Sequence, residues 1–119
     1  MELQYEKLRV TKEIRIFIRN VYVITKHFPK DEVFSLTSQI RRASISVLLN
    51  LAEGHARRGR KEFVHFLKIS IGSLLEVDAA MKIAFDLGYM SEEEVKNIAS
   101  HIQCVYFPLL KLRDSIEKL

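Results

Sequence analysis

Apolar residues recur every three or four positions along most of this sequence, and this spacing is typical of helices with one buried face. In the first such segment the apolar face consists of Val10, Ile14, Phe17, Val21, Ile24 and Phe28. Pro29 disfavours a helical backbone at the residue before it, so we expect this helix to end near Lys26 or His27.

Two more helices are expected in the middle of the chain. The second begins at Thr37, with Ser35 as the other candidate cap, because a hydroxyl there accepts a bond from a free amide of the first turn. We expect it to stop at Gly54, since glycine adopts a left-handed cap conformation cheaply. The third spans about 61–87 and stops at Gly88. Its expected inner face is Phe63, Phe66, Leu67, Ser70, Leu74, Val77, Met81, Ala84 and Phe85.

The fourth helix has the clearest start signal in the sequence. Ser91 and Glu94 have the spacing of a capping box, in which each side chain satisfies a free amide of the first turn. Pro108 lies within the helical pattern that follows, and we expect a kink there because proline removes one backbone hydrogen bond. Four amphipathic segments with short connections predict an all-α, single-domain protein covering residues 1–119, folded as an antiparallel up-down-up-down four-helix bundle.

The second helix is apolar on more than one face. A helix in a lone bundle buries a single stripe, so a second apolar face needs another cover. A second subunit is the simplest cover, and a wide core around small residues is the alternative. The candidate oligomer-interface residues are Ile45, Leu48, Leu49 and Ala52.

Positive charge is concentrated in the first half of the chain. The formal net charge is +4, yet residues 41–61 carry six basic side chains against Glu53 alone. These candidate nucleic-acid-binding residues are Arg41, Arg42, Arg57, Arg58, Arg60 and Lys61. Such asymmetry favours a polyanionic partner that is held by phosphate contacts, and an ordinary solvated face is the alternative. Other basic residues, among them Lys12, Arg15 and Arg19, take the polar side of the first helix.

Residues for catalysis or metal binding are sparse. Glu62 and His65 form one Glu-x-x-His pair, whereas a di-iron site in a bundle needs two such pairs. His101 and Cys104 lie three residues apart, and two ligands do not make a zinc site. Cys104 is expected to be a small core side chain. We therefore predict no enzyme activity, no metal and no cofactor.

The cysteine count and the length of the uncharged stretches bear on where the chain resides. A single cysteine suits the reducing cytoplasm. The longest uncharged stretch, residues 97–110, is shorter than the roughly 20 apolar residues that a membrane-spanning helix needs, so no membrane partner is expected.

The runs SQIRRASISVLLNLAEG and KEFVHFLKISIGSLLEV, followed by LGYM, resemble a known family. These are small bacterial four-helix-bundle proteins encoded in intervening sequences of large-subunit (23S) ribosomal RNA genes, often described as ribosomal-protein-like. The family motif has the same residues at Gln39, Arg41, Arg42, Ala43, Asn50, Ala52, Glu53, Gly54, Phe66, Leu67, Gly72, Ser73 and Glu76. This chain departs from the motif at Leu48 and Leu49, where the family usually has a proline and a small residue.

The resemblance implies an antiparallel four-helix bundle that assembles into a homopentameric ring. It implies association with ribosomal RNA through genetic context, and no catalytic residues. Three hypotheses follow, in descending order: a non-enzymatic oligomer that binds structured ribosomal RNA or another nucleic acid, a protein-interaction scaffold ring with no nucleic-acid role, and a bundle enzyme or metalloprotein.

Overall fold

Four long helices make up most of the chain in the computed structural model, which describes residues 4–57 and 59–119. In chain order the elements are η1 (Gln4–Lys7), α1 (Arg9–Thr25), η2 (Lys30–Glu32), α2 (Leu36–Ala56), α3 (Arg60–Asp86) and α4 (Glu92–Glu117). The described residues contain no strand, so the all-helical prediction is confirmed.

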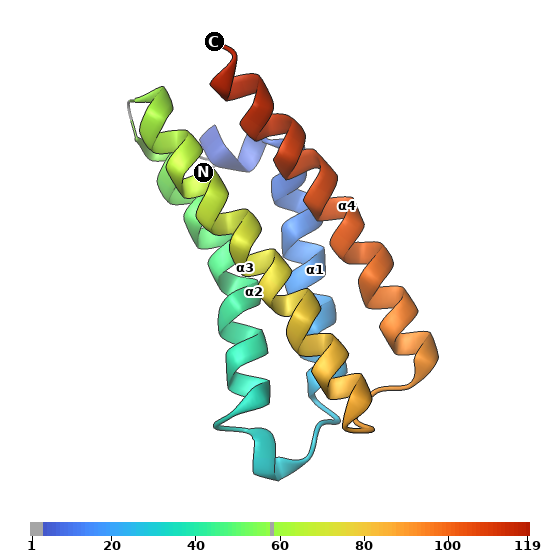
Figure 1. The fold of residues 1–119 in the computed structure, drawn as a ribbon. Coiled ribbons are helices and arrows are strands. Elements are labelled where there is room, and N and C mark those ends of the chain that lie inside the picture. Colours follow the sequence, from blue (N-terminus) through green and yellow to red (C-terminus); the bar gives the residue numbers. More distant parts are fainter. Residues whose placement is uncertain (1–3, 58) are drawn as a thin grey trace.

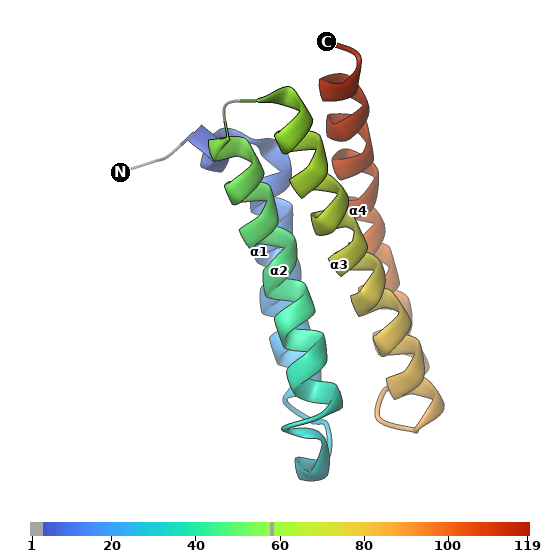
Figure 2. The ribbon, with the colours of Figure 1, turned by 60° about the vertical axis from the view of Figure 1, so that its left-hand side comes forward.

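The helices lie side by side in a bundle that measures 45 × 24 × 23 Å (Figure 1). Neighbours in sequence pack against each other, and α1 also packs against α4. Helices α1 and α3 therefore stand diagonally across the bundle. The α2–α3 connection and the C-terminus lie at one end, and the α1–α2 and α3–α4 connections lie at the other (Figures 1 and 2).

The core is the stack of apolar side chains that the helical spacing predicted. Its largest fully buried members are Phe17, Ile14, Ile40, Leu51, Leu67, Leu74, Met81, Ile98 and Leu109. Burying each such side chain contributes roughly 1.5–3 kcal/mol, which is what drives four amphipathic helices together. Phe85 was expected on the inner face and is 41% exposed, because it lies in the last turn of α3, at the periphery of the core.

The predicted end of α3 and the predicted start of α4 are confirmed. Gly88 follows α3 with φ +83°, and the amide of Tyr89 donates to the Ala84 carbonyl at 2.9 Å. At the start of α4, the Glu94 amide donates to Ser91 Oγ at 3.1 Å, and the Ser91 amide donates to Glu94 Oε1 at 2.9 Å. Helix α4 continues through Pro108, and the kink expected there stays a prediction.

The start of α2 is not capped as expected. Ser35 occupies the cap position but makes no side-chain capping bond. The amide of Leu36 instead donates to Glu32 Oε1 at 3.4 Å, so the preceding turn supplies the acceptor. Thr37 lies inside the helix, and its buried hydroxyl has no partner among the described residues.

Gly54 does not end α2, contrary to the prediction. The helix continues to Ala56, and Gly54 is buried with an ordinary helical backbone. A Cβ added at Gly54 would lie 2.7 Å from Phe66 Cβ, so this glycine is where α2 and α3 approach each other closely. Gly72, in the middle of α3, is exposed, and a Cβ there would meet nothing within 4 Å.

The two helical glycines provide a matched test of this packing. Alanine gains about 1 kcal/mol of helix propensity over glycine at either position. Overpacking costs typically about 1–3 kcal/mol, and we expect that cost at Gly54 only. Gly72→Ala should therefore raise the unfolding temperature, and Gly54→Ala should be the less stable variant by about 1–3 kcal/mol in urea unfolding. Equal stabilisation by both substitutions would contradict the close approach at Gly54.

Candidate nucleic-acid interface

The structure divides the predicted basic residues into two groups. Arg41 and Arg42 lie in the second turn of α2, whereas Arg57, Arg60 and Lys61 lie beyond its other end. At 1.5 Å per residue, the helix between Arg42 and Ala56 separates the groups by about 21 Å. Arg58 lies outside the described residues. Closeness in sequence therefore does not make these residues one binding surface.

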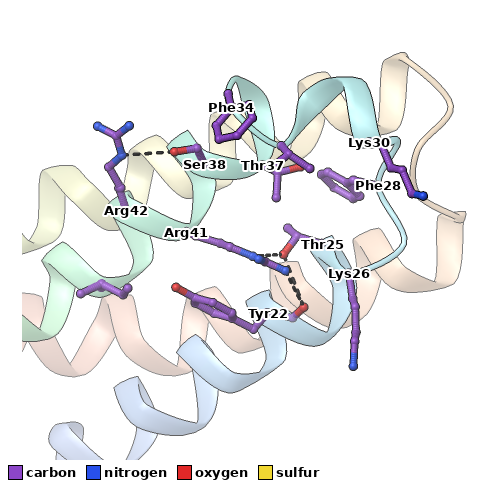
Figure 3. Close-up of a pocket in the computed structure, with 12 residues that line it drawn as sticks. Tyr22, Thr25, Lys26, Phe28, Lys30, Phe34, Thr37, Ser38, Arg41 and Arg42 are labelled. Atoms are coloured by element: carbon purple, nitrogen blue, oxygen red, sulfur yellow. Dashed lines mark hydrogen bonds between the residues drawn. The ribbon is translucent and has the colours of Figure 1, made fainter.

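Arg41 ties α2 to the end of α1. Its Nε donates to Thr25 Oγ1 at 2.8 Å, and its Nη2 donates to the Tyr22 carbonyl at 3.4 Å. The guanidinium also lies over the Tyr22 ring, 4.4 Å from the centroid (Figure 3). These contacts use two of the three guanidinium nitrogens and fix the group in place, so Arg41 has a structural role that its sequence position did not reveal.

The other predicted cations differ in how free they are. Arg42 is exposed and makes one bond, from Nε to Ser38 Oγ at 3.2 Å. Arg57 pairs with Glu53 one turn earlier and lies over the Phe66 ring, 5.2 Å from its centroid. Arg60 and Lys61 are exposed, and neither forms an ion pair within the described ranges. Arg42, Arg60 and Lys61 are thus available to an anionic partner.

A further set of free cations lies on the outward side of α1. We call Lys12, Arg15, Arg19 and Lys26 the α1 cation row. Spacings of three, four and seven residues place them on one helix face. All four are exposed, and no described acidic residue pairs with any of them. The sequence analysis assigned Lys12, Arg15 and Arg19 to the polar side of a helix and gave Lys26 only as its expected end, although the spacing of all four was a signal for a basic stripe.

A groove of about 510 Å³ lies beside the end of the α1 cation row, between the end of α1, the connection through η2 and the start of α2. Tyr22 and Thr25 come from α1, and Thr37 and Arg41 come from α2 (Figure 3). Lys26 stands at the α1 side. The groove thus combines aromatic, hydroxyl and cationic side chains.

The connection that forms one wall of the groove is held by Tyr89. The Tyr89 hydroxyl donates to Glu32 Oε2 at 2.8 Å, and its ring packs against Phe28 with centroids 5.7 Å apart. The hydrogen bond to the Glu32 carboxylate raises the pKa of Tyr89 above its ordinary value of 10.0, helped by desolvation and by the negative charges of Glu32 and Asp31. The phenol therefore stays protonated and keeps the η2 turn attached to the α3–α4 end.

This attachment predicts a pH dependence of stability. A folded-state pKa above the unfolded value stabilises the fold at lower pH, and that contribution is lost as pH rises through the folded pKa. Above pH 10, the unfolding free energy of the wild type should therefore fall more steeply than that of Tyr89→Phe. NMR titration of the tyrosine rings should show a lower pKa for Tyr89 in Glu32→Gln, and Glu92→Gln is the control that should leave it unchanged.

The candidate metal-ligating and catalytic residues are not grouped into a site. Among the described residues, no three His, Cys, Asp or Glu side chains are grouped so as to hold a metal ion. Glu62 and His65 are exposed at the start of α3. His101 Nδ1 lies 3.3 Å from Asn20 Nδ2, and its ring stands edge-on to Phe17 at 5.9 Å. Cys104 is exposed, so its expected place in the core is wrong, because it lies on the outer side of α4.

The four predicted oligomer-interface residues are unequally exposed. Leu49 is 61% exposed, whereas Ile45, Leu48 and Ala52 are half-buried, and Leu48 packs against the core. Helix α3 adds exposed apolar side chains of its own, among them Ile69, Leu75 and Ile83. An apolar outer surface therefore covers parts of both α2 and α3. None of the described helices is long and apolar enough to cross a membrane.

Comparison with known proteins gives one family and one fold. The model of the family described as 23S rRNA-intervening sequence protein matches residues 6–109. A crystal structure from Bacteroides thetaiotaomicron, titled as a protein with unknown function from the S23 ribosomal protein family, superimposes with a TM-score of 0.80. The two sequences are 19% identical, and the match covers 88% of this chain and 95% of that one. No curated protein matches the sequence.

Proposed function

We propose a function for this chain from one established premise: it belongs to the family of 23S rRNA-intervening sequence proteins. It is a non-enzymatic, oligomeric, RNA-associated protein of the cytoplasm. It binds structured ribosomal RNA or another nucleic acid mainly through electrostatic contacts with phosphates. The observation that carries this proposal is the α1 cation row, which continues toward Arg42 across the groove.

Free cations matter because binding to RNA is driven largely by the release of counterions from phosphates. A lysine or arginine already paired with a carboxylate must break that pair before it can contribute. The cations of the α1 row have no such ion pair to break within the described ranges. From Lys12 to Lys26 it extends about 21 Å at 1.5 Å per residue, enough to follow several consecutive phosphates.

The arrangement supports recognition of shape more than of sequence. A helical row of long, mobile side chains contacts the backbone of RNA but does not enter its deep, narrow major groove. Arginine adds forked hydrogen bonds to phosphate, and Arg15, Arg19 and Arg42 supply such groups. The proposed partner is accordingly a folded RNA whose backbone presents a matching curve of charge.

Oligomerisation is the second part of the proposal. The apolar outer surface of α2 and α3, with Leu49 at its most exposed point, is the surface that another subunit covers. We propose that antiparallel bundles associate there into a homopentameric ring, as the family resemblance implies. The same apolar surface also supports the alternative function, a scaffold ring without a nucleic-acid role. The RNA-binding measurement below distinguishes the scaffold ring from the RNA-binding oligomer.

A salt series tests the RNA proposal. If about five phosphates are contacted, the affinity for a structured ribosomal RNA fragment falls with a log–log slope near −4 to −5, at about 0.9 per phosphate. Arg15→Gln/Arg19→Gln should weaken binding and reduce that slope by about 2, since two contacts are lost. Lys82→Gln/Lys96→Gln removes the same charge from α3 and α4, where both lysines pair with acids, and should change the slope little.

A third variant covers the cations at the far end of α2. If Arg60→Gln/Lys61→Gln reduces the slope and the α1 variant does not, RNA lies at the α2–α3 connection and the α1 row is not the interface. Absence of salt-dependent binding in all proteins would contradict the RNA proposal and favour the scaffold.

The molar mass of the protein in solution tests the proposed pentamer. Light scattering of the wild type should give about five times the 13.9 kDa of one chain. Leu49→Lys should reduce this mass toward that of one chain, because a charge in an apolar interface is costly to desolvate. Leu87→Lys changes another exposed leucine, at the end of α3, and should leave the mass unchanged. A wild type that already has the mass of one chain would refute the assembly.

A further inference from the structure

We propose that the groove between α1 and α2 binds one unpaired nucleotide of the RNA, with the base against Phe34 and the flanking phosphates on Arg42, Lys30 and Lys26. This inference rests on the proposed RNA function and assigns to it a specific site and a specific feature of the ligand. The groove was not apparent in the sequence, where no aromatic residue interrupts the basic run.

Phe34 is the first observation. It is 96% exposed, in a chain whose Phe17 and Phe28 are buried. The side chain stands at the mouth of the groove and also lines an adjoining hollow beside Ser38 and Arg42 (Figure 3). An aromatic ring left almost entirely in water has one face free for stacking. Bases stack on such rings in proteins that bind single-stranded nucleic acids.

The cations around the groove are the second observation. Lys26, Lys30 and Arg42 are exposed and form no ion pair with the described residues. Arg41 is held over Tyr22 through Nε and Nη2, which leaves Nη1 without a hydrogen bond among the described residues. A guanidinium that is already oriented loses little conformational freedom when it binds a phosphate.

Acidic groups near the groove affect the side from which the RNA backbone approaches. Glu32 uses both carboxylate oxygens internally, with Tyr89 and the Leu36 amide. Asp31 is exposed on η2, and Glu76 lines the adjoining hollow with Arg42. Glu76 offsets part of the attraction of Arg42 for a phosphate, whereas Lys26 and Lys30 form no ion pair with the described residues. The RNA backbone therefore approaches from α1, where the cation row leads directly to Lys26.

Thr37 is the third observation, and it is independent of charge. Its side chain lines the groove and is 5% exposed, and its hydroxyl has no hydrogen-bond partner among the described residues. Buried hydroxyls are nearly always paired, because an unpaired one loses its hydration without compensation. The unpaired hydroxyl lies beneath the floor of the groove, and a base that enters the groove could pair with it only if the Thr37 side chain turned toward the ligand.

These features favour an unpaired nucleotide over a regular duplex. In a duplex the base faces are stacked on each other and are not available to Phe34. Bulged or looped nucleotides expose both the base face and its edge, and they keep the phosphates that the cations need. The groove volume of about 510 Å³ lies within the range of roughly 300–1,000 Å³ typical of sites for small ligands.

Two RNA hairpins test the inference. One carries 2-aminopurine as a single bulged nucleotide, and the other carries it paired within the stem. Stacking of a base on an aromatic side chain corresponds to about 5- to 150-fold in affinity. The wild type should bind the bulged hairpin more tightly by a factor in that range, with a change in 2-aminopurine emission. Phe34→Ala should lose the preference and keep its affinity for the paired hairpin, whereas Phe34→Tyr should retain the preference.

Phe107→Ala is the matched control, because Phe107 is also exposed, at 60%, and lies on α4 away from this groove. Equal binding of both hairpins by the wild type, with a steep salt slope, would overturn the nucleotide site and leave the RNA function standing. Absence of binding to either hairpin would overturn both. Equal losses in Phe34→Ala and Phe107→Ala would overturn the assignment to the groove. A fall in oligomer mass in Phe34→Ala would show that a second copy occupies it.

Discussion

The close contact between α2 and α3 determines how the other side chains are distributed. At one end Gly54 leaves room for Phe66, and along the seam Ser70 Oγ donates to the Val47 carbonyl at 2.7 Å. Ser46 and Ser73 share a further hydrogen bond of 2.9 Å. Small side chains let the two backbones approach along this seam. Most large apolar residues of the two helices face the core, and a few, Leu49 among them, lie on the outer side, where another subunit can cover them.

Much of the fold could be predicted from the sequence because the signals were local. The Ser91–Glu94 capping box and the left-handed Gly88 depend on residues within one turn, and both are as expected. Gly54 was misinterpreted because a cap and a close approach both favour glycine, and only the position of Phe66 distinguishes them. Cys104 was misplaced for a related reason: a small apolar side chain is compatible with either side of an amphipathic helix.

The candidate interface was harder to predict, because linear density of charge is a poor guide to surface charge. Most of the 21-residue helix α2 lies between Arg42 and Arg57 and puts them near opposite ends of the bundle. The α1 cation row is less dense in sequence, yet its helical spacing brings the residues onto one face. What turns a cation into a candidate ligand is the absence of a nearby carboxylate. That property depends on tertiary packing, as the Arg57–Glu53 pair illustrates.

The α1 cation row and the apolar outer surface of α2 and α3 lie on different helices, whereas Arg42 and Ile45 of α2 also line the groove. Helices α1 and α3 stand diagonally in the bundle, so an assembly built on α2 and α3 leaves the outward side of α1 uncovered. Arg41 connects the two regions, since it starts from α2 and is held by Thr25 and Tyr22 of α1. In a ring of such subunits, each α1 row would repeat around the circumference. Several weak phosphate contacts per subunit would then act together, with binding strengthened by their effective concentration.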